Sequence, residues 1–356
     1  MNVALIIPGS LWYAPYVRIY TRILDYTNTS YSIISWNREG DDKPEGIQYQ
    51  KRCPNGHYSA GYLAYKGYLS FIKIQISKHG FDRIIVFGPQ MACLLAPYLL
   101  RKFRGRYMID YRDLSIDQRL GFKQLFSIML RFSCVNVISS SGFLKCLPKR
   151  SYFLSHNFDV NAAKESIHRP LKGSFYCENE ICILTIGAIR DYSSNVEVVK
   201  ALANKKGIKM QFVGKGDGAV QIERYCIEND IKNISFVGFY QKQEEKEYIK
   251  DCSFMNIFYP RVITHDTALS NRFYNSLIYK KPMIVTKNTT QGDYVEKYQV
   301  GIAIENCNNI EHELRYFFNL DYSSYAKRCN SLLESFLKDQ EEFENAVKRF
   351  IEHGIG

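Results

Sequence analysis

The fold is decided by residues 269–286, which read LSNRFYNSLIYKKPMIVT. Ser270 or Asn271 can cap a helix, whose apolar residues recur at helical spacing until Pro282. The apolar run Met283–Thr286 that follows is typical of a buried strand. A capped helix that leads directly into a buried strand is the repeating unit of a parallel α/β sheet.

The same alternation runs through the whole chain. Strands are expected at Val3–Ile7, Tyr31–Trp36, Arg83–Phe87, Arg106–Ile109, Val135–Ser139, Ile181–Ile186, Ile208–Val213, Ile234–Val237, Phe254–Phe258, Met283–Thr286 and Gly301–Ile304. Helices are expected around Tyr13–Tyr26, Gly61–Lys78, Met91–Arg101, Ile116–Phe132, Ser141–Leu147, Asn195–Asn204, Ala219–Asn229, Glu244–Lys250 and Leu269–Tyr279. Two consecutive doubly wound units fit this order better than one very wide sheet.

The domain organisation follows from length and from one break in the pattern. A chain of 356 residues exceeds what one hydrophobic core usually supports. The polar stretch Asp159–Asn179, with Pro170 and Gly173, reads as a linker, and Ser323–Glu352 is helical throughout. We expect an N-terminal domain over 1–165, a C-terminal domain over 166–335 and a helix over 336–356 that returns toward the first domain.

The charge of the chain is distributed unevenly. Residues 1–170 contain 23 Lys and Arg against 11 Asp and Glu, whereas the remainder contains 24 against 25. This asymmetry indicates an anionic partner for the first half: a membrane surface, nucleic acid or a phosphorylated substrate. A solvated basic face without a partner is the alternative.

The cysteines and the apolar runs indicate the cellular compartment of the protein. The ten cysteines are scattered singly, without a C-x-x-C pair or zinc spacing, which indicates reduced thiols in a reducing compartment. No apolar run reaches the roughly 18 to 20 residues that a membrane span needs. The first residues read as a strand and not as a signal peptide, so we expect a cytoplasmic protein.

Two loops that follow strands in the second half carry chemistry, because open α/β sheets bind ligands beyond the carboxyl ends of their strands. Gly187 lets a backbone approach a ligand, and Arg190 can clamp a diphosphate, although a plain surface arginine is the alternative. Residues 214–219, GKGDGA, formally match the dinucleotide fingerprint. The acid expected about 20 residues further on is missing, so we expect only a glycine-rich turn with Lys215 available to a phosphate.

Taken in order, five segments resemble the donor domain of glycosyltransferase family four. They are IGAIRDYSSN (186–195), FVGKGDG (212–218), ISFVGFY (234–240), FMNIFYP (254–260) and LSNRFYNSLIYKKPMIV (269–285), followed by VEKYQVGIAIE (295–305). The first half resembles the acceptor domain in IDYRDLS (109–115), SSSGFLKCLP (139–148) and FLSHNFD (153–159). The likeness covers nearly the whole chain; each motif is weak alone, and their order is the specific signal.

The resemblance implies a GT-B fold, with two Rossmann-like domains facing a central cleft and C-terminal helices that pack back toward the first domain. It implies transfer of a sugar from a nucleoside-diphosphate sugar, UDP being the most common, with retention and without a required metal or other cofactor. The implied acceptor is a polyprenyl-diphosphate-linked glycan in bacterial capsule or O-antigen synthesis. The implied donor-binding residues are Gly187, Arg190, Gly214, Lys215, Tyr240, Ser270, Asn271, Arg272 and Asn275.

The chain departs from the family pattern at two places. The family often has two glutamates eight positions apart, and here those positions hold Thr267 and Asn275. A catalytic-side histidine is replaced within Asp110–Asp113. The expected catalytic residues are Asp113, Arg190 and Arg272, and the expected acceptor-binding residues are Gly9, Tyr13, Arg112 and Asp113. For Asp113, a purely structural pair with Arg112 is the alternative.

The stretch Tyr62–Arg131 mixes basic residues with aromatic residues that we expect to be exposed, and Arg119–Phe132 reads as a basic amphipathic helix. We therefore expect peripheral attachment of the N-terminal domain to the inner face of a membrane. No nucleic-acid module is present. A catalytically inert subunit of the same fold and a nucleotide-sugar 2-epimerase are the alternative functions.

Overall fold

The computed structural model describes residues 1–40, 45–53, 62–115, 118–171, 173–175 and 180–352. The chain divides into two compact units. The first unit runs from Met1 to His156 and resumes at Asp339, and the second runs from Asn157 to Lys338. The domain boundaries expected at 165/166 and 335/336 lie nine and three residues from these two crossings.

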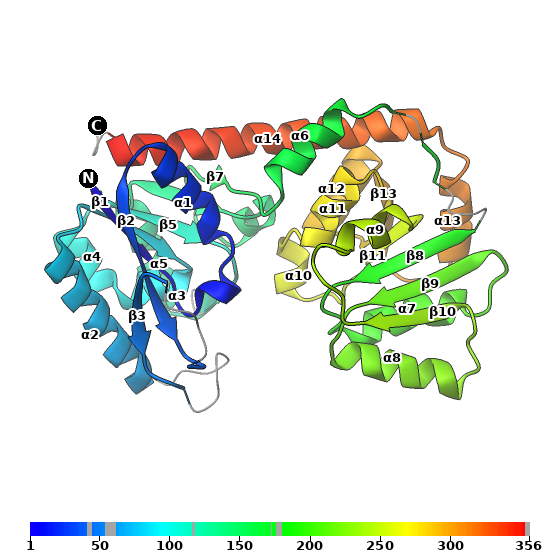
Figure 1. The fold of residues 1–356 in the computed structure, drawn as a ribbon, viewed down its shortest axis with the longest axis horizontal. Helices are drawn as coiled ribbons and strands as arrows, with labels where there is room; N and C mark the ends of the chain where they lie inside the picture. Colours follow the sequence, from blue (N-terminus) through cyan, green and yellow to red (C-terminus); the bar gives the residue numbers. More distant parts are fainter. Residues whose placement is uncertain (41–44, 54–61, 116–117, 172, 176–179, 353–356) are drawn as a thin grey trace. The chain divides into compact units, whose positions relative to one another are not determined.

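The first unit is built on a parallel sheet of seven strands in the order β3-β2-β1-β4-β5-β6-β7 (Figure 1). These strands are β1 (Asn2–Ile6), β2 (Ser30–Asn37), β3 (Ile47–Gln50), β4 (Arg83–Phe87), β5 (Tyr107–Tyr111), β6 (Val135–Ile138) and β7 (Phe153–Leu154). Every residue of β4, β5 and β6 is buried. Such continuous burial is expected of parallel strands covered on both faces.

Two layers of helices cover this sheet. They comprise α1 (Val17–Tyr26), α2 (Tyr62–His79), α3 (Pro89–Leu94), α4 (Ala96–Lys102) and α5 (Phe122–Phe132), with 3-10 turns η1 (Leu11–Tyr13) and η3 (Ser141–Lys145). On one face of the sheet, a hydrophobic core packs helices α2, α3, α4 and α5 against the strands. On the other face, a second core packs α1 and the end of the last helix against the strands.

The second unit has a parallel sheet of six strands in the order β10-β9-β8-β11-β12-β13. The strands are β8 (Ile181–Ile186), β9 (Ile208–Val213), β10 (Ile234–Gly238), β11 (Phe254–Ile257), β12 (Met283–Thr286) and β13 (Gly301–Ile304). The helices are α6 (Val160–His168), α7 (Tyr192–Leu202), α8 (Asp217–Glu228), α9 (Glu245–Lys250), α10 (Ile263–Thr267), α11 (Asn271–Ile278), α12 (Thr290–Tyr298) and α13 (Ile310–Phe317).

The expected fold class is confirmed, and several local predictions are wrong. β3 and β7 are not among the expected strands. The stretch expected to be a linker contains α6, whose N-cap Asp159 accepts hydrogen bonds from the backbone of the first turn. The single helix expected over Met91–Arg101 is two helices, α3 and α4. Gly61 and residues 116–117 of the expected helices lie outside the described residues.

The last helix, α14 (Tyr322–Glu352), belongs to both units. Phe343, Val347 and Phe350 are buried in the same core as strand β1 of the first unit, as the expected return of the C-terminal helix requires. Within the first unit, the Nε2 atom of His156 lies 3.1 Å from a carboxylate oxygen of Asp339. No helix in the described ranges is both long enough and apolar enough to cross a membrane.

Each sheet has a topological switch point, where the strand order reverses direction. It lies between β1 and β4 in the first unit and between β8 and β11 in the second. Ligands of open α/β sheets bind at the carboxyl ends of the strands beside this point. The residues that follow β8 and β11 therefore define the place to look for a site.

Candidate functional site

Arg272 lies at the switch point of the second sheet. Its Nε donates a hydrogen bond to the carbonyl oxygen of Ile186, at the end of β8, and its Nη2 donates to Ala188 at 3.1 Å. The guanidinium also lies 5.7 Å from the ring centroid of Tyr259, which follows β11. These contacts hold a half-buried cation between the two loops.

Gly187 and Tyr240 lie beside this guanidinium. A Cβ atom at Gly187, whose φ is +101°, would lie 3.9 Å from Arg272 Nη2 and 4.0 Å from the Tyr240 hydroxyl. Burial raises the pKa of Tyr240, the charge of Glu245 raises it further and the guanidinium lowers it. The phenol therefore stays protonated at neutral pH and can donate a hydrogen bond.

Asn275, one turn further along α11, contacts the carboxylate of Glu245. Its amide nitrogen donates to the Oε1 atom of Glu245 at 3.0 Å, and the other oxygen of this buried carboxylate pairs with Lys242. The position at which the family often has a glutamate thus holds an amide that contacts a glutamate from α9.

The glycine-rich turn after β9 has a packing role. Gly214 has a φ of +131°, and a Cβ atom there would lie 2.0 Å from the carbonyl oxygen of Gly187. Ile189 N donates to the carbonyl oxygen of Lys215 at 3.1 Å, which joins the two loops directly. The structure therefore shows that close packing of the two loops requires glycine at position 214, one of the residues expected to bind the donor.

Two helices begin near these loops: α7, with Asp191 as its N-cap, and α11. Ser270 caps α11 by accepting a hydrogen bond from Phe273 N, and its hydroxyl donates to the buried side chain of Gln291 at 2.7 Å. Asn271, the first residue of α11, accepts a hydrogen bond from Asn157 Nδ2 at 2.9 Å. The N-terminus of a helix has unpaired N–H groups and a partial positive charge, which favour anions.

Arg190 and Lys215 are two exposed cations at this edge. Lys215 Nζ lies 5.6 Å from the ring centroid of Phe239. Within the described residues Arg190 makes no hydrogen bond or ion pair, so its guanidinium is available to a ligand. Two free cations, a fixed guanidinium and two helix N-termini suit a diphosphate. In the described ranges, no three His, Cys, Asp or Glu side chains group so as to hold a metal ion.

In the first unit, Arg112 has a structural role that corrects its expected contact with an acceptor. Its guanidinium forms a bidentate pair with Asp110, at 2.8 and 2.9 Å, and donates to the carbonyl and hydroxyl oxygens of Ser155. The Tyr20 hydroxyl donates to the same carboxylate at 2.6 Å. Because these groups are buried and bonded to one another, none of them faces solvent.

The other expected acceptor-binding residues are accessible. Asp113 is exposed and does not pair with Arg112, which excludes the structural pair considered as its alternative. Although the side chain is accessible to solvent, the protein around it partly desolvates the carboxyl group of Asp113. This desolvation raises its pKa, and the charge of Arg112 opposes the rise. Tyr13 is half exposed, and its hydroxyl donates to Glu39 at 3.1 Å. A Cβ atom at Gly9 would meet nothing closer than Arg38 Nε at 3.9 Å, so packing does not require glycine there.

The stretch expected to display aromatic residues mostly buries them. The buried ones are Tyr65, Tyr68, Phe103 and Phe126. The amphipathic helix begins at Phe122, not at Arg119, because Gly121 with a φ of +87° forms its N-cap. Leu120 and Phe122 remain exposed, with Lys123 beside them, so a smaller apolar and basic surface survives at the start of α5.

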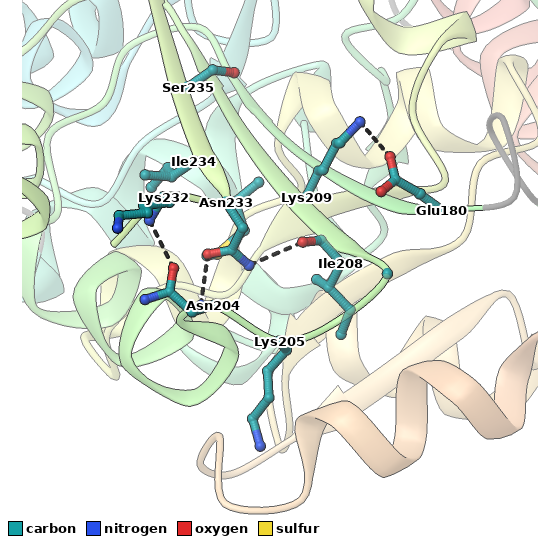
Figure 2. A pocket seen from close by; sticks show the side chains of 11 residues that line it. Glu180, Asn204, Lys205, Ile208, Lys209, Lys232, Asn233, Ile234 and Ser235 are labelled. Atoms are coloured by element: carbon teal, nitrogen blue, oxygen red, sulfur yellow. Dashed lines mark hydrogen bonds and ion pairs between the residues drawn. The ribbon is translucent and has the colours of Figure 1, made fainter. Parts of the chain in front are cut away.

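A pocket of about 590 Å³ in the second unit lies away from this edge, at the amino ends of β9 and β10 (Figure 2). Its polar groups bond to one another: Lys209 pairs with Glu180, and Asn233 Nδ2 donates to the carbonyl oxygen of Ile208 at 2.9 Å. Asn204 N donates to Asn233 Oδ1 at 2.8 Å. These bonds hold the loops before β9 and β10 together, which is a structural task.

Sequence reasoning missed two residues of the candidate site. Tyr259 directly follows β11, so the rule that ligands lie beyond strand ends could have found it. Glu245 begins a six-residue helix and reaches Asn275 across 30 positions. No local pattern indicates such a contact.

No family profile matches the chain, and no curated protein matches it by sequence. Solved structures do match. Sucrose-phosphate synthase from Thermosynechococcus elongatus is 13% identical, with a TM-score of 0.70 over 99% of both chains. Anabaena HepE, solved in complex with UDP, is 11% identical, with a TM-score of 0.66 over 98% of this chain and 99% of that one.

A third match is UDP-GlcNAc 2-epimerase from Methanocaldococcus jannaschii, which is 12% identical. Its TM-score is 0.58 over 95% of this chain and 100% of that chain. At such identities the likeness concerns the fold. The chain therefore has the GT-B fold, with two Rossmann-like parallel α/β domains.

Proposed function

We propose that the protein is a glycosyltransferase that takes a sugar from a nucleoside-diphosphate sugar, with a UDP-sugar as the donor. The observation that carries the proposal is the fixed guanidinium of Arg272 at the switch point of the second sheet. Solved structures of the same fold include a sucrose-phosphate synthase and a protein in complex with UDP, which supports this choice of substrate class.

The proposed chemistry is stabilisation of a departing diphosphate. Arg272, Arg190 and Lys215 supply positive charge, and the N-termini of α7 and α11 add oriented N–H groups. In transfer with retention, the diphosphate can itself accept the proton of the acceptor hydroxyl, so the site needs no separate base. Asp113, an exposed carboxylate that follows β5, is our candidate for a hydrogen bond to the acceptor hydroxyl.

For the acceptor we propose a polyprenyl-diphosphate-linked glycan of a bacterial surface polysaccharide, reached from the inner face of the membrane. The excess positive charge of the first half supports an anionic, membrane-bound acceptor. The exposed side chains of Leu120 and Phe122 beside Lys123 supply a surface that fits a lipid interface.

Nucleotide binding tests the donor site directly. We expect isothermal titration with UDP, GDP and CMP to give micromolar binding of one of them, because the diphosphate meets several cations and helix ends at once. The nucleotide that binds selects the sugar donors to assay. Absence of binding by all three would remove the donor site and make an inert subunit the better interpretation.

The same purified protein separates transfer from epimerisation, which the third structural match makes a specific alternative. Incubation with UDP-GlcNAc alone, followed by NMR of the sugar, would reveal 2-epimerisation without any acceptor. We expect no change at C2 of the sugar, whereas conversion there would replace the transferase proposal.

Membrane attachment is expected to depend on the start of α5. Flotation with phosphatidylglycerol vesicles should be salt-sensitive and at least about 100-fold weaker in Leu120→Ser/Phe122→Ser, because burial of such side chains contributes about 1.5–3 kcal/mol each. Tyr26→Ser removes an aromatic residue of α1 that is more exposed than Phe122, at 79% against 37%, and serves as the control. Equal flotation of both variants would contradict a role for this surface.

A further inference from the structure

A second pocket, of about 670 Å³, opens at the amino edge of the first sheet, between the ends of α4 and α5 and the end of α14. Its walls combine arginines with aromatic rings and one exposed thiol. They include Arg104, Arg131, Arg349, Phe132, Phe350 and Cys134. All of these residues belong to the first unit, so the pocket forms within one domain.

Among the described residues, the arginines of this pocket have no acidic partners. Within the described part of the chain, no ion pair joins Arg104, Arg131 or Arg349 to a carboxylate. Arg104 stacks on Phe132, with its guanidinium carbon 3.9 Å from the ring centroid. The pocket of Figure 2 behaves differently, because Lys209 there pairs with Glu180.

Arg83 is a buried arginine behind the pocket, and it too lacks an acidic partner in the described residues. Arg83, the first residue of β4, is 4% exposed, and its Nε and Nη1 atoms have no hydrogen-bond partner. Its guanidinium carbon lies 5.0 Å from the ring centroid of Phe350, which lines the pocket. Asp82, the acid whose charge acts on Arg83, accepts a hydrogen bond from Asn2 N.

Burial of the Arg83 guanidinium without a hydrogen-bond partner for two of its nitrogens lowers the stability of the fold. Removing donors of a charged group from water without a partner costs about 1–3 kcal/mol or more. Three arginines that line one hollow without a carboxylate in the described residues, with Arg83 behind them, also repel one another. A bound anion would relieve both effects, and buried groups without partners often mark such an ion.

We propose that this pocket binds the phosphate group of a ligand whose remainder is apolar or aromatic. Guanidinium groups recognise phosphate oxygens through paired hydrogen bonds, and the rings of Phe132 and Phe350 offer the remainder an apolar wall. The pocket lies at the amino edge of the first sheet, whereas the proposed nucleotide site lies at the carboxyl edge of the second. The inference therefore does not rest on the proposed function.

Cys134 provides a local readout that needs no enzymatic activity. It is an exposed cysteine on the pocket wall, and burial raises the pKa of its thiol while Arg83 lowers it. A phosphate beside it would raise this pKa further, and each pKa unit lowers the reactive thiolate about tenfold. The rate of labelling by N-ethylmaleimide at Cys134, mapped by peptide mass, thus reports occupancy. Cys182 in the second unit serves as the internal reference.

Two probes distinguish the sources of the phosphate. Inorganic phosphate is compared with sodium chloride at equal ionic strength, and phosphatidylglycerol vesicles are compared with phosphatidylcholine vesicles. We expect one of these probes to slow labelling of Cys134 about tenfold. Protection by inorganic phosphate indicates a soluble phosphate ligand, and protection by phosphatidylglycerol vesicles alone indicates a lipid headgroup.

The protection should be lost in Arg104→Gln/Arg349→Gln and also in the single variant Arg131→Gln. The control Arg22→Gln/Lys73→Gln removes the same charge from exposed positions of α1 and α2 and should keep the protection. The proposal is overturned if neither probe slows labelling, or if the protection persists in both pocket variants.

Discussion

Replacement of Arg112 by alanine is expected to lower the free energy of unfolding by about 3–5 kcal/mol, because it leaves a buried carboxylate without its counterion. Asp110 is fully buried and receives two hydrogen bonds from Arg112 and one from Tyr20. Burial and the charge of Asp110 raise the pKa of Tyr20, so this phenol remains a donor at ordinary pH. Urea unfolding followed by circular dichroism measures the loss.

A neighbouring residue supplies the control. Asp113→Ala changes an exposed carboxylate three positions from Asp110 and should alter the free energy of unfolding by about 0.5 kcal/mol or less. Adding Asp110→Asn to Arg112→Ala should recover part of the stability, since the buried charge is then gone. Unchanged stability of Arg112→Ala together with lost transfer would restore the expected role of Arg112 in acceptor binding.

Arg112 also shows why sequence reasoning identified a segment after a strand without the contacts that hold its side chains. The segment 110–113 follows a strand whose position was predicted, and polar residues after strands are candidates for a site. What decides the role of Arg112 is Ser155, 43 positions away, which receives two of its hydrogen bonds. No local pattern specifies that contact.

The fold was predictable because buried parallel strands are continuous apolar runs. The bounds expected for β4, β8, β9, β12 and β13 agree with the structure. β3, with sequence IQYQ, escaped prediction because it is a half-buried edge strand without such a run. β7 has only two residues. Edge strands pair on one side only, so tertiary packing decides them more than sequence pattern does.

In the candidate site, sequence reasoning found the loops and the helix end but not how they are held together. Gly187, Tyr240 and Arg272 were expected in one site, and in the structure a Cβ atom at Gly187 would lie within 4.0 Å of both the Tyr240 hydroxyl and Arg272 Nη2. The glycine of the turn after β9 was assigned to a ligand, although a side chain at Gly214 would meet the Gly187 carbonyl oxygen. A sequence pattern identifies a glycine without revealing what approaches it.

Replacement of Arg272 by alanine is expected to weaken binding of the preferred nucleoside diphosphate about 100-fold, as measured by titration, since a charge-assisted contact near a helix N-terminus is lost. Arg272→Lys should recover little of this affinity. A lysine cannot reproduce the planar fork that reaches the carbonyl oxygens of Ile186 and Ala188 together. Arg224→Ala, which removes an exposed arginine from α8, should bind like the wild type.

The comparison with Arg190 decides how Arg272 acts. Arg190 makes no contact that holds the fold within the described residues, so Arg190→Ala should weaken binding through charge alone and leave thermal unfolding unchanged. If both variants lose affinity and keep their melting temperature, both guanidinium groups contact the diphosphate. If Arg272→Ala lowers affinity and melting temperature together while Arg190→Ala binds normally, Arg272 only positions the loop after β8. Wild-type affinity in both variants would exclude the diphosphate from this edge, because Arg272 and Arg190 are the two guanidinium groups proposed to contact it.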